Sequence, residues 1–110
     1  MPAFKPAHLR VMAEYESSGI WAVGAVGPFR HGMVRHGELD LPPELAVAFR
    51  AWIDDYLDRL ESPRIWDSDA FNAEGSRLAS ALKRHVGPTV RVTFVPERED
   101  GGLAEEVEVP

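Results

Sequence analysis

The alternation of apolar and polar positions predicts short strands at both ends of the chain. Apolar and polar residues alternate over residues 9–15. Leu9, Val11 and Ala13 would share one face of the chain, which predicts a half-buried strand. The turn-forming sequence ESSG follows at 16–19. Residues 20–26 are mostly apolar, with β-branched and aromatic side chains, so we expect a second strand that pairs back on the first. Residues 89–95 repeat the alternation and predict a third strand.

A continuous apolar stripe at helical spacing predicts a first helix after residue 42. Either Pro42 or Pro43 occupies its first turn, where the missing N–H is no loss, and Pro63 prevents its continuation. The stripe recurs at intervals of three and four residues, as one face of a helix does. It consists of Leu45, Phe49, Trp52, Ile53, Tyr56, Leu57 and Leu60.

A second helix is predicted from about residue 68 to residue 86. Asp67 is its expected N-cap, and Trp66 and Phe71 have the spacing of a hydrophobic staple. The dipeptide Gly87-Pro88 is a typical helix stop. Gly75 costs a helix about 1 kcal/mol relative to alanine. Because Gly75 lies on the expected buried face, we interpret it as a point of close packing.

These elements predict a single α+β domain of order ββααβ over residues 1–95. Two helices would pack on one face of a small antiparallel or mixed sheet. Two interpretations of residues 96–110 are open. The segment either forms a hairpin with a short last strand containing Val107 and Val109, or it is a frayed acidic tail.

The charge is unevenly distributed along the chain. The net charge is −6, and residues 1–95 carry 11 basic and 12 acidic side chains, whereas residues 96–110 carry one basic and six acidic. A protein that binds nucleic acid by neutralising phosphates needs a basic face, so this distribution argues against that function. A basic protein is the partner that the charge favours.

The remaining composition bounds the setting in which the protein works. The chain has no cysteine, which excludes disulfides, thiol catalysis and cysteine zinc sites. It has neither an apolar run long enough to span a membrane nor an apolar signal-peptide region near Met1. We therefore expect a cytoplasmic protein without a membrane partner, without a nucleic-acid partner and without a cofactor.

The polar side of the first predicted helix carries an acidic stripe. Asp54, Asp58 and Glu61 follow the spacing i, i+4 and i+7, so they share one face opposite the apolar stripe. Asp55 is placed to pair with Arg59 at i+4. The stripe is either a site for a basic partner or an ordinary solvated helix surface.

The glycine-rich stretch "VGPFRHGMVRHGELDLPPEL" at 26–45 contains the other candidate site. We interpret it as a surface loop that contacts a partner through its cationic and imidazole side chains. Those side chains are Arg30, His31, Arg35 and His36. The alternative is a metal site, because zinc prefers imidazole nitrogen and carboxylate oxygen, although the spacing matches no recurring zinc motif. Its candidate ligands are His31, His36, Glu38 and Asp40.

The order of landmarks resembles that of small uncharacterised bacterial proteins of high-GC genomes. The landmarks are "AEYESSGIW", "LPPELAVAFRAWIDDYLDRL", "W…FNAEGSRLA…LK" and "VRVTF", within residues 9–95. They are packing and capping residues, and that group has no assigned catalytic residues to carry over. In size, acidity and predicted fold, the chain is also similar in type to immunity proteins of bacterial toxin systems.

No catalytic constellation is apparent, and we assign no catalytic residue. The glycine-rich loop lacks the lysine and hydroxyl residue of a phosphate-binding loop, and no serine lies in a nucleophile elbow. The sequence therefore favours a non-catalytic protein-binding module of immunity or inhibitor type. Two alternatives remain at this stage. One is a small metal protein or enzyme that uses His31 and His36, and the other is a homo-oligomeric accessory protein, such as a homodimer paired through an edge strand after residue 89.

Overall fold

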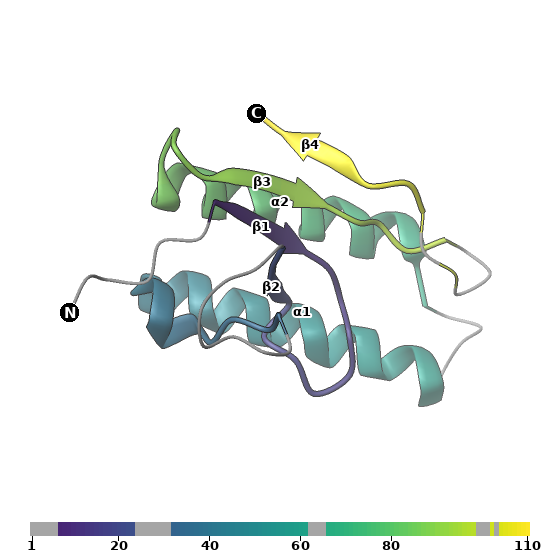
Figure 1. Cartoon of the computed structure of the whole chain (residues 1–110). Coiled ribbons are helices and arrows are strands. Elements are labelled where there is room, and N and C mark those ends of the chain that lie inside the picture. Colours follow the sequence, from purple (N-terminus) through teal and green to yellow (C-terminus); the bar gives the residue numbers. More distant parts are fainter. Residues whose placement is uncertain (1–6, 24–31, 62–65, 99–101, 103) are drawn as a thin grey trace.

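The predicted α+β order is confirmed in a computed structural model of the chain (Figure 1). The structure describes residues 7–23, 32–61, 66–98, 102 and 104–110. Strands β1 (His8–Val11) and β2 (Ile20–Ala22) come first, and a short 3-10 helix η1 (His36–Leu39) follows. Helices α1 (Pro43–Glu61) and α2 (Ser68–Val86) lead to strands β3 (Arg91–Phe94) and β4 (Val107–Val109).

The strands form one mixed sheet in the order β2-β1-β3-β4. β1 pairs with β2 antiparallel and with β3 parallel, and β3 pairs with β4 antiparallel. Leu9 lies between Ala22 and Val92 in this register, and Val92 in turn faces Val109. A parallel pair needs a long crossover, and the segment that contains α1 and α2 supplies it between β1 and β3.

Both helices form where the apolar stripes and caps predict them. α1 begins at Pro43, and α2 has the predicted N-cap, because the Asp67 carboxylate accepts a hydrogen bond from the N–H of Ala70 at 3.1 Å. The staple is also present, since the rings of Trp66 and Phe71 lie 5.1 Å apart. α2 ends at Val86, and the residue that caps it, Gly87, takes a φ of +90° that side-chain-bearing residues rarely adopt.

The core lies between the two helices and one face of the sheet. Leu9, Val11 and Val92 point into it from the strands and are fully buried. Trp52 of α1 stacks on Phe71 of α2 with ring centroids 4.8 Å apart, and its indole N–H donates to the Phe71 carbonyl at 3.0 Å. The indole thus packs its large apolar surface without leaving its polar atom unpaired.

The end of the chain joins the sheet as an edge strand, which is the first of the two interpretations left open by the sequence. The N–H of Ala104 donates to the carbonyl of Pro96 at 2.9 Å, and that of Arg98 donates to Gly102 at 2.7 Å. β4 then runs back along β3 (Figure 1). The acidic segment is therefore held against the domain over its described residues.

Candidate functional site

The outer face of α1 presents four acidic side chains to solvent. Asp54, Asp55, Asp58 and Glu61 are all exposed, and we call this group the acidic face. The predicted spacing of Asp54, Asp58 and Glu61 places them on one side of the helix, away from buried Trp52. Among the residues that the structure describes, none of the four forms an ion pair. Partial burial, followed by the charge of Asp58, raises the pKa of Asp55.

Arg59 does not neutralise this acidic face, and the predicted pair between Asp55 and Arg59 is wrong. The guanidinium turns inward, and its Nη1 donates to the Glu97 carboxylate at 3.2 Å. It also lies over the rings of Tyr56 and Trp66, at 5.0 and 5.7 Å from their centroids. An exposed i, i+4 ion pair contributes only a few tenths of a kcal/mol, so a shielded carboxylate and two aromatic faces can outcompete it.

Glu97 is the least expected member of the site, because it is almost fully buried. Its backbone is clamped by Asn72, whose side-chain amide donates to the Glu97 carbonyl at 2.8 Å and accepts from the Glu97 N–H at 2.9 Å. Burial raises the pKa of the Glu97 carboxyl, and the Arg59 charge acts in the opposite direction. Within the described part of the chain, its Oε2 has no hydrogen-bond partner. The neighbouring Tyr56 hydroxyl has a raised pKa, caused by burial and then by the charge of Glu97.

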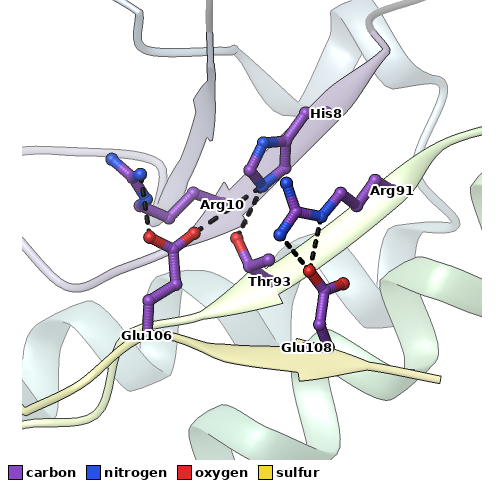
Figure 2. A network of polar contacts seen from close by, with 6 residues as sticks. All are labelled: His8, Arg10, Arg91, Thr93, Glu106 and Glu108. Carbon is purple, nitrogen blue, oxygen red and sulfur yellow. Dashed lines mark hydrogen bonds and ion pairs between the residues drawn. The ribbon is translucent and has the colours of Figure 1, made fainter.

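The face of the sheet that points away from the helices carries charges that are already paired. His8 and Arg10 of β1 alternate with buried core residues, and Figure 2 shows them meeting Glu106, which precedes β4. Arg10 binds the Glu106 carboxylate at 2.9 Å, and His8 lies 3.7 Å from it. The His8 ring also hydrogen-bonds the Thr93 hydroxyl at 2.8 Å. Burial and the nearby Arg91 lower the pKa of His8.

A second ion pair extends this network toward the edge of the sheet. Arg91 of β3 binds the Glu108 carboxylate of β4 (Figure 2). Together with the residues of the first cluster, these side chains line a cavity of about 360 Å³. Since Glu97, Glu106 and Glu108 each face an arginine, much of the acidity of residues 96–110 is balanced within the molecule.

The glycine-rich stretch is described only in its second half. Arg30 and His31 lie outside the described residues. Arg35 is exposed at the start of η1, and its N–H donates to the Glu38 carboxylate at 2.9 Å. His36 is half-buried, with its ring nitrogen 2.9 Å from the Ser18 carbonyl oxygen and its ring 5.7 Å from that of Phe49.

The candidate metal ligands in this stretch have local structural roles. Glu38 caps η1, and Asp40 closes it with a left-handed backbone at φ +50°. Across the ranges that the structure describes, no three His, Asp or Glu side chains gather closely enough to hold a metal ion. His36, Glu38 and Asp40 are therefore not brought together as a ligand set.

The sequence predicts the acidic face, but it does not predict that Glu97 binds Arg59 and so leaves that face without an ion pair. Helical periodicity is a local signal, so it places Asp54 and Asp58 directly. Glu97 lies in an acid-rich segment that looks solvated, and it meets Arg59 only because the chain returns past α1 after β3. The polar network on the sheet had one signal in the sequence. His8 and Arg10 are two residues apart on one strand, and Arg91 and Thr93 are two residues apart on another, so each pair lies on one face of its strand.

One comparison with known proteins finds a match over most of the chain. A family model described as "Serratia CdiI immunity protein-like" matches residues 7–97. No curated protein and no solved structure matches the chain. Within the described residues, neither long helix is apolar enough to cross a lipid bilayer.

Proposed function

The chain belongs to the Serratia CdiI immunity protein-like family, and from that membership we propose that it is an immunity protein. In this proposal it is a non-catalytic module that binds a bacterial protein toxin and blocks it. The toxin is basic at the contact surface. Binding takes place in the cytoplasm, in keeping with a cysteine-free sequence that needs no oxidising compartment.

The acidic face of α1 is the observation from which we infer the toxin-binding surface. Asp54, Asp58 and Glu61 are exposed and unpaired in the described structure, whereas Glu74 of α2 is bound by Arg77 at 2.6 Å. A surface of uncompensated charge of one sign attracts a partner of the opposite sign and accelerates their encounter. Charges that are already paired contribute much less of this field.

The support beneath the acidic face suits a binding role. Phe49, Trp52 and Tyr56 anchor α1 to the core along its inner side. A surface held by a rigid helix loses little conformational freedom on binding, so more of the contact energy appears as affinity. The same arrangement would leave the acidic side chains fixed in spacing along the helix.

Capture followed by affinity measurement tests this proposal. The wild-type protein, immobilised, would be exposed to lysate of its source cells beside a variant with Asp54→Lys, Asp58→Lys and Glu61→Lys. Each retained protein would be identified by mass spectrometry, purified and measured for its Kd and its toxicity when produced alone. A matched control, Glu16→Lys with Glu44→Lys and Glu105→Lys, makes the same change in net charge at exposed positions that form no ion pair in the described structure.

The proposal expects a basic, toxic protein that binds wild type and the control but binds the α1 variant at least about tenfold more weakly, as expected when close charge pairs are lost. Equal affinity of that toxin for all three proteins would contradict the use of the acidic face. A captured protein that is not toxic, and whose activity is not blocked by binding, would contradict the immunity function itself.

A further inference from the structure

Arg59 has a position from which it could neutralise the acidic face, yet it points elsewhere. It follows Asp58 directly and lies one helical turn after Asp55, the spacing at which a carboxylate and a guanidinium ordinarily pair. In the structure its charge is instead committed to Glu97, 38 residues further along the chain. Among the described residues, no cation therefore pairs with the acidic face.

We propose that Glu97 is a positioning residue that holds Arg59 away from the acidic face, so that the face stays uncompensated for a basic partner. This inference rests on the proposed function, because it assigns Glu97 a role in binding without contact with the toxin. Glu97 is too deeply buried for such contact, with only 2% of its side chain exposed.

Three neighbours make the inward position of Arg59 the stable one. The carboxylate of Glu97 is shielded from water, so its attraction for the guanidinium is screened less than that of an exposed aspartate. Tyr56 and Trp66 offer aromatic faces to the same cation. Trp66 is itself fixed, because its indole N–H donates to the backbone carbonyl of Asp55 at 3.1 Å.

The charge of Glu97 can be removed without dismantling its surroundings. Asn72 binds the backbone N–H and carbonyl of Glu97, and neither bond involves the carboxylate. A Glu97→Gln variant therefore retains this clamp and nearly the same side-chain volume. What it loses is the negative charge that attracts Arg59.

The first arm of the test needs no partner. The pKa of Asp55 would be measured by NMR titration in four proteins: wild type, Glu97→Gln, Arg59→Gln and the double variant. We expect Arg59→Gln to change this pKa little in wild type, where the guanidinium faces inward. In the Glu97→Gln background the same substitution should raise the pKa of Asp55 by ~0.3 unit, because there it removes a cation that has moved to the acidic face.

This first arm includes a matched control variant and a check that each variant is folded. Glu74→Gln makes the same charge change and also frees an arginine, Arg77, but on α2. It should leave the titration of Asp55 unchanged. Amide spectra would establish that each variant is folded. If Arg59→Gln raised the pKa of Asp55 equally in both backgrounds, Arg59 would already neutralise the face and the inference would be overturned.

The second arm uses the captured toxin. Glu97→Gln should slow its association about twofold to threefold and weaken the salt dependence of that rate, whereas Glu74→Gln should not. An unchanged association rate in Glu97→Gln, with charge reversal of the acidic face still abolishing binding, would overturn this inference alone. If the charge reversal of the acidic face left toxin binding unchanged, the proposed function of that face would be overturned instead.

Discussion

Gly75 illustrates how a single residue sets the distance between α2 and the sheet. A β-carbon at this position would lie 2.7 Å from ring carbons of both Phe94 and Trp52, well inside normal contact distance. The prediction of close packing at this helical glycine is therefore confirmed. The helix accepts its unfavourable propensity because the absence of a side chain lets two aromatic rings approach the backbone.

Substitution at Gly75 should be costly. Gly75→Val is expected to lower the free energy of unfolding by about 3 kcal/mol, since its side chain overpacks a core with no space for it. Ala73→Val, at an exposed position of the same helix, should cost about 0.5 kcal/mol through helix propensity. Urea unfolding of the two variants measures the difference. Similar losses at both positions would contradict the packing described here.

Glu97 should give the stability of the protein a characteristic pH dependence. Its pKa is raised in the folded state, mainly by burial, so the folded chain binds this proton more tightly than the unfolded chain does. Its contribution to stability is therefore most favourable at low pH and falls as pH rises from the ordinary range of glutamate through the raised pKa. Relative to Glu97→Gln, wild type should lose stability from about pH 4 toward pH 7.

Glu74 provides the comparison of opposite sign. Its hydrogen bond to Arg77 lowers its pKa, so its contribution is present at neutral pH and is lost as pH falls through the lowered value. Relative to Glu74→Gln, wild type should therefore gain stability as pH rises. Urea unfolding across this pH range would measure both differences. Slopes of the same sign for the two variants would be inconsistent with the environments assigned to these carboxyls.

At the scale of elements, the helices could be predicted more closely than the strands. The apolar stripe from Leu45 to Leu60 lies within α1, and α2 has the predicted limits of 68 and 86. Strong periodicity over five turns, with a cap at Asp67, is information contained in the local sequence. β1 and β3 are shorter than the alternation suggested, because pairing depends on the neighbouring strand and not on alternation alone.

β4 is the element that the sequence left undecided, and two valines test its place in the sheet. Val109 is buried against the sheet, whereas Val107 is 47% exposed. Val109→Ala should lower the free energy of unfolding by about 1.5 kcal/mol, because it removes two buried methyl groups. Val107→Ala should lower it by about half of that or less. Both changes lower strand propensity equally. Equal effects on urea unfolding would mean that the segment does not pack as an edge strand.

At the scale of the whole molecule, the structure divides charge between paired and unpaired surfaces. Three carboxylates of the C-terminal segment are bound by Arg10 and Arg91 of the sheet and by Arg59 of α1. The acidic face of α1 receives no cation in the described structure. This division could not be predicted from the sequence, since each of these three ion pairs joins residues that are not neighbours on one helix or strand. The acidic stripe itself could, because it lies within one helix.

Growth of cells that produce the captured toxin tests the central claim most directly. The toxin would be expressed in a sensitive bacterial host with wild type, with the triple reversal of Asp54, Asp58 and Glu61, or with the matched reversal of Glu16, Glu44 and Glu105. The account predicts that wild type and the matched control restore growth, whereas the α1 variant, although folded and equally abundant, does not. Growth restored equally by all three proteins would contradict binding through the acidic face, and growth restored by none would contradict the immunity function.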